Sequence, residues 1–238
     1  MNIAMGLGIG TATVLAAKIG SGDKLSAKRI CTHALLLAVV SAIPLSAFGI
    51  LTLTPLFRLL GADESTLPLI SDYMNIWFAG LLFLYVPMIG NSTIRATGDT
   101  KTPSIIMALA GLANGIMDPI LIFGIGPIPA LGIQGAAIAT VISWLVASIA
   151  VIYLLATHKR MITLQGFGFT RLSTTLPTII QDWYSMLRIG IPASATNMLG
   201  PIVLGILTRL ISQYGEAAVA GYGVGTRIES LAMVVVMA

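Results

Sequence analysis

Seven long apolar runs limit what this chain can fold into. About 20 mostly apolar residues are enough for a helix to cross the hydrocarbon core of a bilayer. Only 9% of the 238 residues are charged, against roughly a quarter in a typical soluble domain. The sequence therefore predicts an all-α polytopic membrane protein, a helix bundle with five complete and two partial transmembrane helices. The runs extend over Met1 to Gly20, Ile30 to Leu53, Leu67 to Asn91, Pro103 to Ile125, Leu131 to Thr157, Met186 to Ile211, and Ala217 to Ala238.

The basic residues predict which helix ends face the cytoplasm. Lys and Arg near the ends of membrane helices are retained on the cytoplasmic side. The first, third and fifth connections hold or border Lys18, Lys24, Lys28, Arg29, Arg95, Lys101, Lys159, Arg160, Arg171 and Arg188, whereas the alternate connections hold only Arg58 and Arg209. The first group is therefore expected inside. The positive charges form no clustered patch, which argues against a nucleic-acid partner, and the single cysteine, Cys31, leaves no internal disulfide and no structural zinc site.

The longest connection, residues 158–185, divides the chain into a first part, residues 1–157, and a second, residues 186–238. Within and just after it, apolar residues recur at helical spacing beside charged ones. This pattern predicts an amphipathic helix on the cytoplasmic surface, anchored by Trp183 and Tyr184. His33, near a helix end on the same side, is expected to be an interfacial polar residue. The apolar positions are Leu172, Leu176, Ile179, Ile180, Trp183, Met186 and Leu187.

Asp118 needs an explanation, because no other residue between Pro103 and Ile125 is ionisable. A carboxylate at membrane depth costs several kcal/mol unless it has a partner, a cavity or a proton. Asn114 lies one helical turn earlier on the same face. Pro119 has no N–H, so it leaves the carbonyl of Gly115 without its usual donor. These groups predict a cation or proton site, and the alternative is a carboxyl that only bonds a neighbouring helix.

Thr140 is the third candidate for this site. The connection GPIPALG, residues 126–132, is short, so the helices on either side of it should be antiparallel neighbours. At 1.5 Å per residue, Asp118 and Thr140 lie at depths of roughly 10 and 13 Å from the outer helix ends. The two side chains are therefore expected at one level. The alternative for Thr140 is a hydroxyl that bonds only its own helix backbone.

Four stretches of this sequence resemble the multidrug and toxic compound extrusion (MATE) family. They are IGSGDKLSAKR (Ile19 to Arg29), RATGDTKTP (Arg95 to Pro103), NGIMDPILIFG (Asn114 to Gly124) and LGIQGAAIATVIS (Leu131 to Ser143). The resemblance implies a fold of twelve membrane helices in two lobes that alternate access around a central cavity. It implies export of organic cations or drugs in exchange for Na⁺ or H⁺ by a multi-pass protein of the prokaryotic inner membrane. On this basis the chain would run from the second helix to part of the eighth, and its partners would include the remaining helices.

The resemblance also implies roles for particular residues. Asn114, Asp118 and Thr140 match an Asn, Asp and Thr that form a cation or proton site in the N-terminal lobe of one branch. A second branch has an acid on the seventh helix, after a Gly-x-Pro that matches Gly190 to Pro192, but no acid occurs here between Asp182 and Glu216.

The function that the sequence predicts is a secondary active antiporter. It is not expected to be an enzyme, and it needs no cofactor beyond a bound Na⁺ or H⁺. The alternatives are a flippase for lipid-linked saccharides, a channel, and a truncated lobe that transports nothing.

Overall fold

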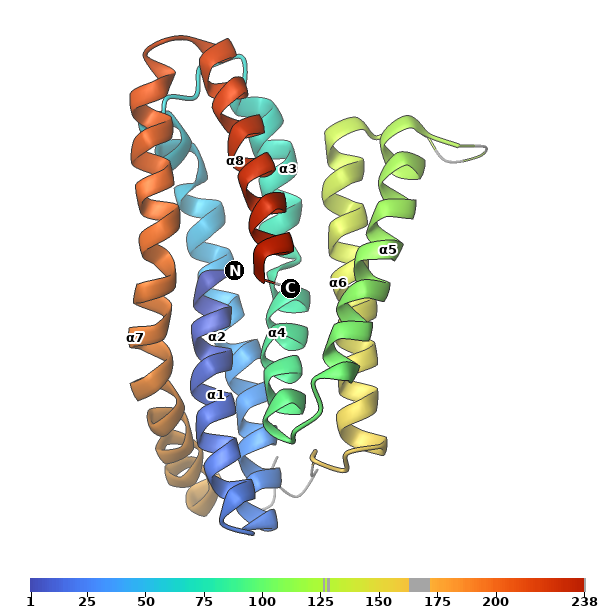
Figure 1. Ribbon diagram of the computed structural model, residues 1–238, viewed down its shortest axis with the longest axis vertical. Coiled ribbons are helices and arrows are strands. Elements are labelled where there is room, and N and C mark those ends of the chain that lie inside the picture. The colour runs from blue at the N-terminus through green and yellow to red at the C-terminus, as the bar shows by residue number, and fades with distance from the viewer. Residues whose placement is uncertain (126, 128, 163–171, 238) are drawn as a thin grey trace.

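The computed structural model describes residues 1–125, 127, 129–162 and 172–237, and all of its regular secondary structure is helical (Figure 1). The helices are α1 (Asn2–Gly20), α2 (Lys24–Leu59), α3 (Leu67–Ala79), α4 (Leu81–Ala96), α5 (Lys101–Phe123), α6 (Gly132–Thr157), α7 (Leu172–Ser212) and α8 (Glu216–Met237). Five of them, α1, α2, α5, α6 and α7, are long and apolar enough to cross a membrane. The prediction of an all-α membrane bundle is confirmed.

Two predicted segments have different limits. The run from Leu67 to Asn91, predicted as one helix, is broken at Gly80 into α3 and α4, which are bent by 50° relative to each other. The chain lies close to α6 at the break, because a Cβ at Gly80 would overlap the side chain of Val141. The second run is longer than predicted, since α2 begins at Lys24 and extends to Leu59. Its start is capped by Asp23, whose carboxylate accepts the backbone N–H of Ser26 at 3.1 Å.

The amphipathic segment is helical but is not a separate surface helix. It continues without a break into the next membrane run to form α7. Trp183, predicted to anchor this segment in the membrane surface, donates from Nε1–H to the backbone carbonyl of His33 in α2 at 2.8 Å. His33, expected at the interface, is only 1% exposed. Tyr184 is 66% exposed.

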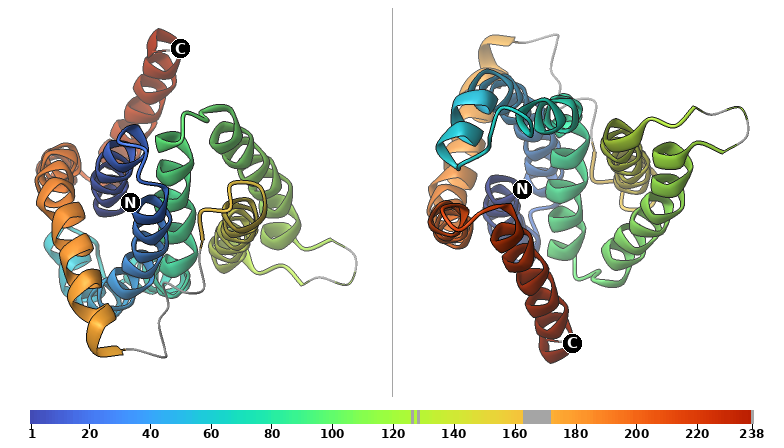
Figure 2. Two further views of the ribbon diagram at one scale, coloured as in Figure 1. Left: turned by 90° about the horizontal axis from the view of Figure 1, so that it is seen from below. Right: turned by 90° about the horizontal axis from the view of Figure 1, so that it is seen from above.

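The helices of the bundle form two groups. Helices α1, α2, α4 and the lower part of α7 form one group, while α5 and α6 form an antiparallel pair at its side (Figures 1 and 2). One buried cluster joins α1, α2 and α4 around Ile30, Tyr85 and Ile89. A second joins α2, α4, α5 and α6 around Ile94 and Val151. Thus α2 and α4 are buried on two faces and connect the α5–α6 pair to the rest.

The helix ends that were predicted to be cytoplasmic lie together at one end of the bundle. The α1–α2 turn, the α4–α5 turn and the end of α6 all lie at the bottom of Figure 1. There the Asp99 carboxylate, which precedes α5, lies 2.7 Å from Nζ of Lys159 beyond α6. We call this the inner end, following the predicted sidedness, and the opposite end the outer end.

Close helix contacts hold α7 against α1. Since lipid is as apolar as the side chains, membrane helices associate through small residues that allow near approach. A Cβ at Gly10 would overlap the carbonyl of Met186, and one at Gly6 would overlap Ser194. Ser194 Oγ also donates to the carbonyl of Ile3 at 3.2 Å.

Candidate functional site

The site predicted from sequence lies between α5 and α6. The two helices are held in an antiparallel pair by the turn between them, where the backbone N–H of Leu131 donates to the carbonyl of Leu121 at 3.0 Å. Gly135 allows the close approach, because a Cβ there would overlap the same carbonyl. This arrangement sets the first turns of α6 opposite the last turns of α5. It brings Thr140 to the level of Asn114.

The structure brings the three predicted side chains together. Asn114 Nδ2 lies 3.3 Å from Oδ1 of Asp118 and 3.4 Å from Oγ1 of Thr140, so one amide group bridges the other two residues. All three residues are half-buried. Thr140 Oγ1 also donates to the carbonyl of Ala136 at 3.0 Å, the backbone bond that was the alternative for this residue. The hydroxyl thus has both contacts.

Asp118 is not ion-paired within the described part of the chain, where the four ion pairs involve other carboxylates. Its one side-chain hydrogen bond there comes from the neutral amide of Asn114. Helix α5 continues past Pro119 to Phe123, so the carbonyl of Gly115 keeps its place in the helix but has no N–H from Pro119. A carboxylate that is not neutralised by a basic side chain is free to take a proton or a cation.

A small cavity adjoins the site on its inner side. Its volume is about 180 Å³, and its lining includes Asn114 and Thr140 together with Met88, Met107 and Trp144. Asn114 and Thr140 join this cavity to the site, Ser143 is a further polar residue of its wall, and the other lining residues are mostly apolar.

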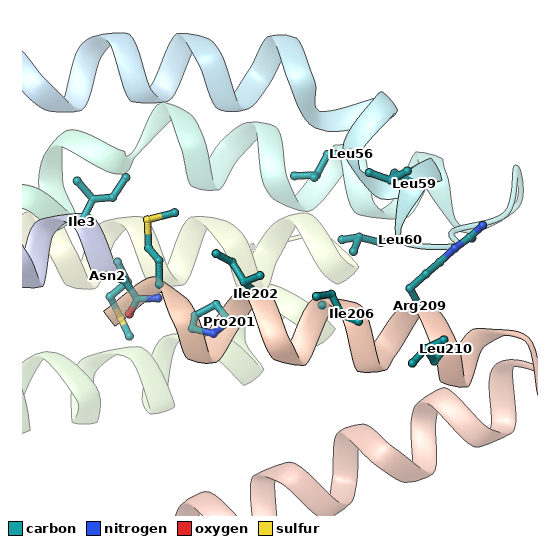
Figure 3. Close-up of a pocket in the computed structure, with 13 residues that line it drawn as sticks. Asn2, Ile3, Leu56, Leu59, Leu60, Pro201, Ile202, Ile206, Arg209 and Leu210 are labelled. Carbon is teal, nitrogen blue, oxygen red and sulfur yellow. The ribbon is translucent and has the colours of Figure 1, made fainter. Parts of the chain in front are cut away.

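A larger cavity lies in the outer half of the bundle, between α1, α2 and α7 (Figure 3). Its volume is about 580 Å³. Leu56, Leu59 and Leu60 at the end of α2 face Ile202, Ile206 and Arg209 of α7 across this space. Arg209 is the one charged side chain among the described lining residues.

Comparison with known proteins identifies the family. The MatE family model matches residues 1–120, just over half of the 238 residues. The chain belongs to the MATE family.

Solved MATE structures have the same arrangement of helices. An inward-facing conformation of a multidrug resistance MATE family transporter of the MOP superfamily superposes with a TM-score of 0.82, at 28% identity over 98% of this chain and 51% of that one. An outward-facing conformation of such a transporter gives a TM-score of 0.80 at 29% identity, over 99% of this chain and 50% of that one. Among named relatives, an FAD transporter of Shewanella oneidensis is 44% identical over 100% of this chain and 51% of its own length. The chain spans about half the length of the MATE proteins it matches.

The structure also assembles a cluster that the sequence did not predict. The carboxylate of Asp182 in α7 accepts from Nε and Nη2 of Arg29 in α2, at 2.9 and 3.3 Å. Nδ1 of His33 lies 2.7 Å from the same carboxylate. A sequence signal was present: Asp182 falls three residues after Ile179 and four before Met186, on the apolar stripe of its helix. An acid on such a stripe requires a buried partner.

Proposed function

We propose that this chain is part of an ion-coupled efflux transporter of the prokaryotic inner membrane, with Asp118, Asn114 and Thr140 as its cation or proton site. The observation that carries the proposal is the half-buried Asp118 carboxylate, bonded to a neutral amide and not to a basic group in the described residues. Family membership and the likeness to two conformations of a MATE transporter support it.

The site offers two kinds of ligand geometry. With Nδ2 of Asn114 toward Asp118 and Thr140, the amide donates a hydrogen bond to the carboxylate, and this arrangement does not require a bound cation. Rotation of that amide by half a turn would present its oxygen instead, since the two ends of the group have nearly the same shape. Oxygens from all three side chains would then face one point, a ligand set suited to Na⁺. Binding of a proton in place of Na⁺ requires only the carboxylate of Asp118.

Coupling follows from the charge of Asp118. Binding H⁺ or Na⁺ neutralises a carboxylate that is costly at membrane depth, so it changes the relative stability of two conformations of the bundle. An inward membrane potential adds about 2.3 kcal/mol per charge per 100 mV to the movement of a cation. Export of an organic compound is thereby driven by entry of an ion, without covalent chemistry.

Two substrate classes are proposed for the outer cavity. Organic cations and drugs are the class that the family resemblance implies. A flavin dinucleotide is the second, favoured by the 44% identity to a protein named as an FAD transporter and by the position of Arg209 at the rim of an apolar cavity. An arginine guanidinium suits phosphate and carboxylate groups and repels cations.

The test is transport in proteoliposomes under an imposed Na⁺ or pH gradient. Because the chain covers 51% of the Shewanella relative, it is assayed alone and in a chimera in which it replaces the matching half of that protein. We expect the chimera to move FAD or a fluorescent organic cation only when a gradient is present. Movement of a lipid-linked sugar, passive ion flux without exchange, or no flux from an intact chimera would favour the flippase, the channel and the inactive lobe respectively.

A further inference from the structure

The Arg29–His33–Asp182 cluster lies at the inner end of the bundle, away from Asp118 and from the outer cavity. Arg29 and His33 belong to the first turns of α2, and Asp182 to the first part of α7. Asp182 is 7% exposed and His33 1%, whereas the Arg29 side chain is 40% exposed. Two buried groups are thus joined to one that is partly exposed at the surface of the bundle.

Each contact in the cluster joins α2 to α7. An ionised carboxylate only accepts hydrogen bonds, so Nδ1 of His33 carries the proton that it shares with Asp182. The other ring nitrogen, Nε2 of His33, is buried without a hydrogen-bond partner among the described residues. Trp183, the neighbour of Asp182, adds a hydrogen bond to the carbonyl of His33. These bonds connect residues 149 to 153 positions apart in the chain.

The position of the cluster relative to the outer cavity suggests its role. Below the cavity, α7 is in close contact with α1 through Gly6 and Gly10. Toward the outer end, the same helix is separated from the end of α2 by the outer cavity of about 580 Å³ (Figure 3). The bundle is therefore closed at its inner end and open at its outer end. The related transporter structures were solved in both inward-facing and outward-facing conformations.

We infer that Arg29, His33 and Asp182 form an inner lock, which holds α7 against α2 while the outer cavity is open and separates when the inner end opens. This inference rests on the proposed transport function, because a lock has a purpose only if the two ends open alternately. The unpartnered Nε2 of His33 fits a contact that is made and broken, since an unsatisfied buried polar atom lowers the stability of the closed form. A contact that is never broken would be more stable if Nε2 of His33 had a hydrogen-bond partner.

The experiment measures thiol reactivity at both ends of the chain in proteoliposomes. Met186→Cys reports on the inner end, because Met186 is fully buried beside Thr11 of α1. Ile202→Cys reports on the outer cavity, where Ile202 is 51% exposed. Cys31 is the internal control for unfolding: it is buried on the other face of α2, against Ile94 and Val151. Labelling at each site is followed by peptide mass spectrometry.

We expect Asp182→Asn to raise the labelling rate at position 186 by about tenfold, the order expected for breaking a partly exposed ion pair with a buried acid. Labelling at position 202 should fall, and Cys31 should stay unreactive. Arg29→Gln should act in the same direction. Glu64→Gln, which breaks the exposed Arg58–Glu64 pair, should change none of the three sites.

Three results would overturn the inference. Equal labelling at position 186 with and without Asp182→Asn means that the cluster does not keep the inner end closed. A rise at 186 together with Cys31 means that the acid only supports the fold. A rise at 186 with no fall at 202 means that the two ends are not linked. Absence of coupled export from the transport chimera would refute the proposed function and leave these labelling results to be judged separately.

Discussion

Replacing Asp118 by Asn gives the sharpest test of the proposed ion site, because it removes one charge and keeps the shape of the side chain. The stability change can be worked from the contacts. A carboxylate at the centre of a membrane helix costs about 2.5 to 3.5 kcal/mol on insertion scales. The described compensation is one hydrogen bond from a neutral amide, at 3.3 Å, and such a bond contributes about 0.5 to 1.5 kcal/mol. Asn keeps an acceptor for that bond.

The Asp118→Asn variant should therefore unfold at the same or a higher temperature than the parent, with a gain of at most about 2 kcal/mol because the residue is half-buried. Its gradient-driven export should be lost. Thermal unfolding in detergent measures the first quantity, and substrate flux under an imposed Na⁺ or pH gradient in proteoliposomes measures the second. Both are measured in the chimera, so that one preparation gives both values.

Asp72→Asn is the matched control. Asp72 is an exposed acid on α3, another helix of the same bundle, so its neutralisation should alter neither quantity. Export by Asp118→Asn at the parental rate would refute the coupling role. A loss of about 2 kcal/mol or more in stability would instead mean that the charge is needed for the fold, contrary to the contacts described above.

Further predictions concern the cavity, the helix contacts and the inner end. Arg209→Gln should reduce export of FAD by about tenfold and leave that of an organic cation unchanged or faster, measured as flux of each substrate. Gly10→Ala should lower the unfolding free energy by about 1 to 3 kcal/mol, because its Cβ overlaps a carbonyl of α7. Gly111→Ala is its control, since a Cβ there has nothing within 4 Å. The hydrogen bond from Lys159 holds the pKa of Asp99 well below its usual range, with a smaller effect from bonds at the start of α5. A lowered folded-state pKa stabilises the fold above the ordinary value of about 4, and this stabilisation is lost as the pH falls further. Asp99→Asn should thus lower the melting temperature at pH 7, and the difference from the parent should shrink below about pH 4.

Local patterns in the sequence were enough to predict most of the helices and the proximity of the three residues of the candidate ion site. The length of the apolar runs predicts the membrane-spanning helices, because about 20 helical residues are needed to cross the hydrocarbon core. The spacing of Asn114 and Asp118 puts them on one face, and a short turn with a fixed rise per residue places Thr140 beside them. The observed distances of 3.3 and 3.4 Å agree with that geometry. Their role in ion binding stays a prediction.

The features that sequence did not predict depend on contacts between distant segments. At the bend, Gly80 packs against Val141 of α6, which lies far along the chain. The fate of the amphipathic segment depends on whether its apolar stripe meets lipid or protein, and both surfaces are apolar. Here the stripe meets α1 and α2, where Met186 is fully buried. The spacing of apolar residues predicts an apolar stripe on the helix but does not show which surface covers it.

The two acids on apolar helix faces show why the partner decides the function. In the sequence, Asp118 stands alone in an apolar membrane run, whereas Asp182 belongs to a segment predicted to be amphipathic. In the structure, Asp182 is bonded to Arg29 and His33, so its charge is balanced within the protein. Asp118 is bonded to an amide, so in the described residues its charge is not balanced by a basic side chain. Neutralising Asp182 should consequently alter which end of the bundle is open, whereas neutralising Asp118 should leave the structure in place and remove the response to the ion gradient.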